Sequence, residues 1–180
     1  MSVNRVRFSF TPDEQTLHGS PDLGGLTADG LLHEDDGLII YHRFYADVGV
    51  SVDGVELYGW QDRFDDNAPH FTLKVPLLVT AFGILDAVRE SRRCDDLVSF
   101  DPEEFGEWSM AFRRNPGDIA VRSRLTKQSA TAPFDEWERA CLTFQQEVRA
   151  FLLAEFPALI QHPELGSWFR GEVDLPESWT

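Results

Sequence analysis

The chain has 180 residues, of which 42% are hydrophobic and 12% aromatic, so there is enough apolar material for a folded core and a wholly disordered protein is excluded. Its formal net charge is −15, from 31 acidic and 16 basic residues. A field of this sign repels nucleic acid and anionic membranes and favours basic proteins as partners, although the same charge also serves solubility.

The length predicts a single domain over residues 1–180. No apolar run reaches the length of a membrane span, and the first ten residues lack the features of a secretory signal. We therefore expect a cytoplasmic protein. Its two cysteines, Cys94 and Cys141, are expected to be free thiols, as is usual in a reducing compartment.

The first predicted element is a strand over residues 5–10, in which apolar and polar residues alternate. Residues 11–37 are rich in Gly, Pro and Asp and predict a long irregular loop that is functional or mobile. An apolar and aromatic run over residues 38–45 predicts a second strand. The Asp53-Gly54 pair between two β-branched runs then predicts a tight hairpin.

Helical spacing of apolar residues predicts a buried helix from Pro76 to Arg93, with its arginines suited to the negative end of the helix dipole. A short strand over residues 97–100 follows. Two strands over residues 107–114 and 118–125 alternate cleanly and are joined by an Asn115-Pro116-Gly117 turn.

The last main helix is predicted from Pro133 to Glu155, and a short helical turn follows over residues 158–161. Together the elements predict an α+β fold: a mainly antiparallel sheet of about five to six strands with two main helices packed on one face. The tail over residues 161–180 contains Trp168 and Trp179 and is expected to pack on the domain. An alternative is that these aromatic residues pack against a second copy of the chain in a homodimer.

The stretch between the predicted strands at 97–100 and 107–114 mixes carboxylates with aromatic residues, as a docking surface for a basic protein does. A solvated loop has the same composition. The candidate partner-binding residues are Asp95, Asp96, Asp101, Glu103, Glu104, Phe105 and Glu107.

Signatures of serine hydrolases, zinc sites and nucleotide-binding loops are all missing, so we predict no catalytic residues, no cofactor and no metal site. The alternative function is a small enzyme or ligand-binding protein with a pocket under the N-terminal loop. His33, Glu34, Asp35 and His42 are the residues that such a site could use.

Three arginines, Arg113, Arg122 and Arg124, are predicted on one face of the 107–125 hairpin. Arginines in such a row can hold a carboxylate or a phosphate through paired hydrogen bonds. In a chain with this excess of acidic residues, we expected them to pair with carboxylates of the same molecule.

Four features over about residues 38–160 carry a resemblance: a Val-Asp-Gly-Val hairpin, a Val-Pro-Leu-Leu helix start, a Trp-Ser-Met-Ala-Phe strand with an Asn-Pro-Gly-Asp turn, and a closing helix that ends in Phe-Pro. In this order they resemble small uncharacterised actinobacterial α+β proteins, several of which look like immunity proteins of bacterial toxin systems. The resemblance implies a cytoplasmic binding protein that blocks a toxin with an acidic surface laid over a basic cleft. It assigns no individual residue.

Overall fold

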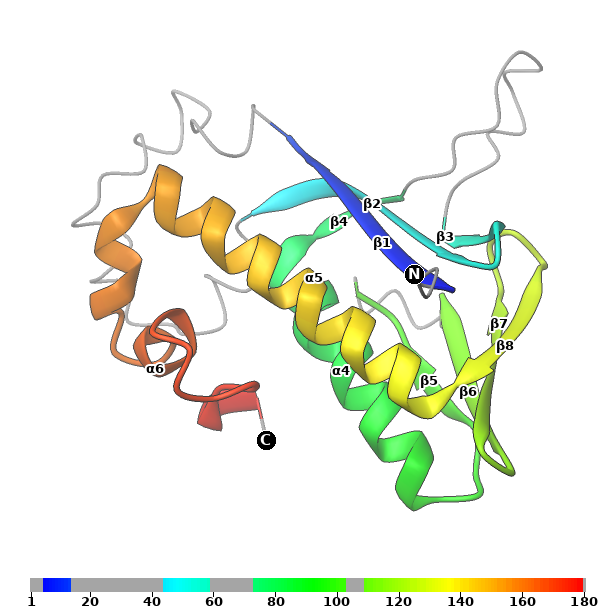
Figure 1. Ribbon diagram of the computed structural model, residues 1–180. Coiled ribbons are helices and arrows are strands. Elements are labelled where there is room, and N and C mark those ends of the chain that lie inside the picture. The colour runs from blue at the N-terminus through cyan, green and yellow to red at the C-terminus, as the bar shows by residue number, and fades with distance from the viewer. Residues whose placement is uncertain (1–4, 14–43, 59–72, 103–108, 180) are drawn as a thin grey trace, which may run out of the picture.

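The first of two antiparallel sheets is built around a long central strand (Figure 1). The computed structural model describes residues 5–13, 44–58, 73–102 and 109–179. In the first sheet β2 (Tyr45–Val52) pairs with β1 (Val6–Pro12), and on its other side with β3 (Val55–Tyr58) and β4 (Leu73–Pro76). Strand β1 thus takes in the start of the predicted loop over residues 11–37. Residues 14–37 of that loop, and most of the strand predicted over residues 38–45, lie outside the described residues.

The predicted hairpin joins β2 to β3 through Asp53 and Gly54, which have φ angles of 50° and 81°. Two successive positive φ angles are what a two-residue hairpin turn of type I′ requires, and Asp-Gly is among the pairs that adopt it most readily. The Arg5 side chain donates hydrogen bonds to the Asp53 carboxylate, the shorter at 2.7 Å. This hydrogen bond lowers the pKa of Asp53 from its usual value.

The second sheet is a meander of four strands in chain order (Figure 1). It consists of β5 (Val98–Phe100), β6 (Met110–Asn115), β7 (Asp118–Ser123) and β8 (Ser129–Pro133). The α+β class and the antiparallel pairing are confirmed. The strands form two sheets of four, where we expected one sheet of five to six. The additional strands are β4 and β8, and in the described residues no strand of one sheet pairs with a strand of the other.

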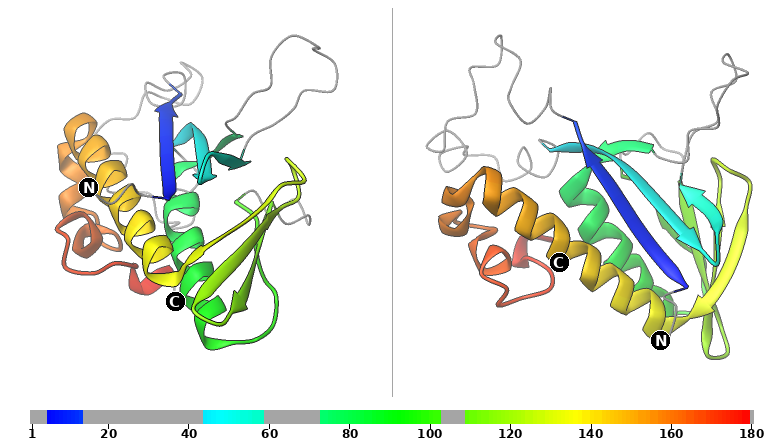
Figure 2. Two further views of the ribbon diagram at one scale, coloured as in Figure 1. Left: turned by 45° about the vertical axis from the view of Figure 1, so that its right-hand side comes forward. Right: turned by 45° about the horizontal axis from the view of Figure 1, so that its top comes forward.

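The two main helices are α4 (Leu77–Arg93) and α5 (Phe134–Glu155), as predicted. Each begins directly after a short strand that ends in proline, β4 and β8 respectively. Figure 2 shows the helices side by side, with both sheets packed along them. Arg89 of α4 donates to Glu138 of α5 at 2.8 Å and to Asp174 of the C-terminal tail at 2.7 Å, so one cation joins three segments.

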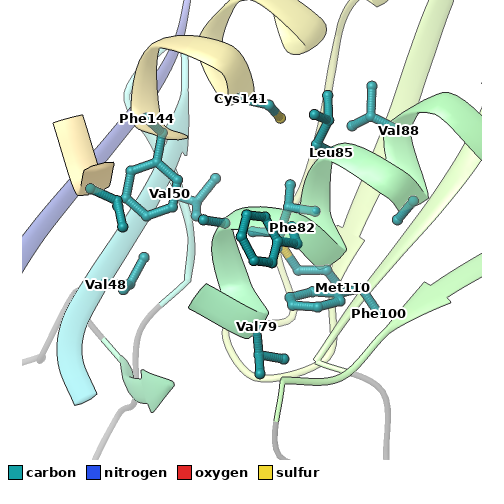
Figure 3. Packing of buried hydrophobic residues seen from close by; sticks show 14 of the residues in the cluster. Val48, Val50, Val79, Phe82, Leu85, Val88, Phe100, Met110, Cys141 and Phe144 are labelled. Carbon is teal, nitrogen blue, oxygen red and sulfur yellow. The ribbon is translucent and has the colours of Figure 1, made fainter. Parts of the chain in front are cut away.

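The core draws side chains from both sheets and both helices (Figure 3). Val50 of β2, Phe82 of α4, Met110 of β6 and Phe144 of α5 are all buried in one cluster. Burial of such large apolar groups supplies most of the free energy of folding. Within the described residues, no helix is both long and apolar enough to cross a membrane.

The aromatic tail packs within its own chain. After α5 come η2 (Pro157–Gln161), α6 (Gly166–Phe169) and η3 (Glu177–Trp179). The rings of Trp168 and Trp179 both stand edge-on to Phe82, with centroids 4.9 and 5.4 Å away. The Trp168 indole N–H donates to the buried side chain of Gln145, and the Gln145 amide donates to the carbonyl of Ala81. Aromatic contacts and a buried polar link therefore hold the tail against both helices.

Candidate functional site

The acidic stretch predicted to bind a partner begins where α4 ends. The N–H of Cys94 donates to the carbonyl of Glu90 at 3.1 Å and closes the helix. Asp95 and Asp96 follow in a bend before β5, and Asp101 follows β5. The remaining predicted partner-binding residues lie outside the described part of the chain: Glu103, Glu104, Phe105 and Glu107.

The two aspartates after α4 are open to solvent. The Asp95 side chain is 94% exposed, and its carboxylate lies 3.7 Å from a guanidinium nitrogen of Arg114, which is itself half-exposed. Exposed ion pairs of this kind are worth at most about 1 kcal/mol, so Asp95 can exchange Arg114 for another cation at little cost. Asp96 is exposed too, whereas Asp101 is half-buried and already takes part in other interactions. The accessible negative charge of this stretch thus lies at Asp95 and Asp96.

An exposed leucine adjoins these carboxylates and was not predicted. Leu97 is 59% exposed, the highest value among the large hydrophobic residues of the described chain. Along β5, Val98 and Phe100 face the core and Ser99 faces solvent, so the two-residue period of a strand places Leu97 on the solvent side. This alternation could have been read from the sequence. We call Asp95, Asp96 and Leu97 the acidic patch.

The predicted arginine row lies on the solvent face of the second sheet. Phe112 of β6 pairs with Val121 of β7, and both are buried. Their neighbours along the strands therefore point the other way, which places Arg113 and Arg122 on the outer face, where both are exposed. Arg124 follows the end of β7 and is half-buried.

The residues predicted for the alternative, an enzyme or ligand pocket, all lie outside the described chain: His33, Glu34, Asp35 and His42. His162 is the one histidine that the described residues include, and its Nδ1 accepts the backbone N–H groups of Glu164 and Leu165 at 3.2 Å each. This histidine has a structural role. Among the described residues, no group of three or more His, Cys, Asp or Glu could hold a metal ion.

A groove between β1 and α5 has a volume of about 480 Å³, and its lining includes Phe8, Phe144, Glu136 and Glu147. A second cavity of about 360 Å³ lies between the end of α4, the β6–β7 turn and the start of α5. Among the described residues that line these two cavities there is no histidine and no cysteine. Cys141 is fully buried, and this burial raises the pKa of its thiol far above the usual value, so it is unsuited to act as a nucleophile.

Comparison of the chain with protein-family models, with curated proteins and with solved structures gave no match. The resemblance to immunity proteins therefore stays a prediction.

Proposed function

We propose that the protein is a cytoplasmic protein-binding or inhibitor module whose acidic patch docks on a basic partner, such as a toxin that it neutralises. The observation that carries this proposal is an exposed leucine directly beside two exposed carboxylates, in a chain with a net charge of −15. Leu97 supplies apolar area that a partner can bury. Asp95 and Asp96 supply charges that attract a cationic surface.

The two kinds of residue have different effects on binding. Charges at the rim of an interface mainly set the association rate and its dependence on salt, whereas a buried apolar anchor mainly sets the dissociation rate. The negative field of the whole chain adds long-range steering toward a basic surface, screened beyond about 8 Å at physiological ionic strength. Separate substitutions in the acidic patch therefore test the two contributions independently.

The test measures binding kinetics of the purified chain against basic proteins of the host, starting with the products of neighbouring genes. Asp95→Lys combined with Asp96→Lys should slow association about tenfold at low ionic strength and flatten the salt dependence. Leu97→Ala should speed dissociation about tenfold, which corresponds to about 1.4 kcal/mol. If the partner is a toxin, both variants should also protect cells from it less well than the wild type does.

The matched control is Glu155→Lys combined with Glu164→Lys, at two exposed positions near the C-terminal end of α5. Each reversal adds two charges, so both pairs change the net charge from −15 to −11. The control pair should bind nearly as the wild type does. The proposal is wrong if no basic partner binds, if the patch variants bind normally, or if the control pair slows association equally.

A further inference from the structure

Three strands of the second sheet, β6 to β8, carry charge opposite to that of the whole protein. Residues 109–133 span β6 to β8 and contain five basic residues and one acidic residue, a net charge of +4 within a chain of −15. Because salt screens charges beyond about 8 Å, a ligand on this sheet responds mainly to the local positive charge. Strands β6 to β8 therefore form an anion-attracting surface on an acidic protein.

Strand register places two of these basic residues, Arg113 and Arg122, on the outer face. Arg113 of β6 lies opposite Ala120 of β7, and Arg122 of β7 lies opposite Ala111 of β6. The two arginines are thus diagonal neighbours on adjacent strands, and their side chains rise from points about 7–8 Å apart. Between and beside them the outer face carries the small side chains of Ala120, Ser129 and Thr131, and Asp118 lies on the same face at the turn end of β7. A flat floor of this kind lets another backbone approach closely.

The two arginines have no carboxylate partner within the described residues. Arg114, next along the chain, pairs with Asp95, and Arg124 takes part in other interactions. No described carboxylate lies within 4.0 Å of Arg113 or Arg122, so the expected pairing with the protein's own acids is not found there for these two residues. Their ten N–H donors, five on each guanidinium, are open to a ligand.

We propose that this outer face binds an extended acidic segment of a partner protein, with carboxylates on alternate residues held by Arg113 and Arg122. Residues i and i+2 of an extended strand point the same way and lie about 6.6 Å apart, which matches the separation of the two arginines. Each guanidinium can take one carboxylate through two parallel hydrogen bonds. This surface is distinct from the acidic patch and takes a ligand of opposite charge, so the inference does not rest on the proposed function.

A protein segment suits this face better than a nucleic acid. The described strands place no aromatic side chain on the outer face, and base stacking on aromatic rings is a main source of affinity for single strands. A long polyanion would also extend from the basic sheet over the acidic remainder of the protein, where it is repelled. A short segment with a few carboxylates remains within the positive region.

The probe is a fluorescently labelled octapeptide that alternates Glu with Thr, and its binding to the full chain is followed by fluorescence anisotropy at about 0.15 M ionic strength, where salt screens the acidic remainder of the protein. The reference peptide replaces each Glu by Gln. The acidic peptide should bind and the neutral one should not. Arg113→Gln combined with Arg122→Gln should weaken binding by at least about tenfold, the loss expected for two charged hydrogen-bonded contacts. Arg113→Lys with Arg122→Lys should restore only part of the affinity, because lysine keeps the charge but cannot form two parallel hydrogen bonds to a carboxylate.

The matched control removes two exposed arginines elsewhere, by Arg93→Gln on α4 combined with Arg139→Gln on α5. It changes the net charge equally and should leave peptide binding unaltered. Urea unfolding checks that the strand variants fold, since exposed substitutions away from the core usually change stability little. The proposal is overturned if the acidic peptide does not bind, if the control pair weakens it equally, or if a single-stranded oligonucleotide binds to the face more tightly than the peptide.

Discussion

Gly83 lies in the middle of α4, where glycine is normally unfavourable, and its substitution by alanine tests how that helix packs on the second sheet. In a helix interior alanine is more favourable than glycine by about 1 kcal/mol. A methyl group at Gly83, however, would overlap Cε2 of the Phe100 ring and lie 2.8 Å from its Cδ2. Carbon atoms prefer separations of about 3.5–4.0 Å, so the Phe100 ring would have to move.

The size of the effect follows from these opposing contributions. Phe100 is only 7% exposed and belongs to the same core cluster as Met110 and Phe82, so its ring has little room to move (Figure 3). Forcing extra atoms into a packed core costs about 1–3 kcal/mol, and a direct overlap with a ring belongs at the upper end of that range. After the gain in helix propensity is subtracted, Gly83→Ala should destabilise the protein by about 2 kcal/mol.

The free energy of unfolding is measured by urea titration with tryptophan fluorescence, for Gly83→Ala, Phe100→Leu and the double variant. Phe100→Leu removes the ring edge that the methyl group meets. In that background Gly83→Ala should be neutral or stabilising, by up to about 1 kcal/mol. The resulting coupling between the two positions should be about 2–3 kcal/mol. The reasoning is refuted if Gly83→Ala alone is neutral or stabilising, or if the two effects are simply additive.

The polar link to the tail gives a second prediction. Gln145→Leu should lower the free energy of unfolding by about 1–3 kcal/mol, because it leaves the buried indole N–H of Trp168 without a hydrogen-bond acceptor. Gln146→Leu, at the exposed neighbouring position, should change the free energy of unfolding by less than about 0.5 kcal/mol. Equal effects in urea titrations of the two variants would contradict it. The third concerns Glu56, whose pKa is raised by burial. The stability that depends on a neutral Glu56 is fully present below the pKa of the unfolded chain, about 4.3, and is lost as the pH rises through the pKa of the folded state. Glu56→Gln should therefore raise the Tm at neutral pH and leave it nearly unchanged at about pH 3.5; an equal shift at both pH values would show that burial of the charge is not the cause.

Elements whose sequence signals are local could be predicted without the tertiary structure. The Asp53-Gly54 turn needs only two residues that tolerate positive φ, and both have it. The helices α4 and α5 follow from apolar spacing that any window of three or four turns contains. The two-residue period of β6 and β7 likewise placed Arg113 and Arg122 on the face opposite the core.

Pairings and contacts between residues far apart in the chain could be established only from the tertiary structure. Ser129–Pro133 carries no strong strand pattern and becomes β8 because β7 offers it a free edge. Glycine is unfavourable inside a helix, and the reason for Gly83 is seen only where Phe100 of β5 packs against it. Which arginines meet a carboxylate was also undecided, since Arg114 reaches Asp95 while no described carboxylate reaches Arg113. A local pattern fixes the direction of a side chain within its element, but its partners are fixed only by how distant segments pack together.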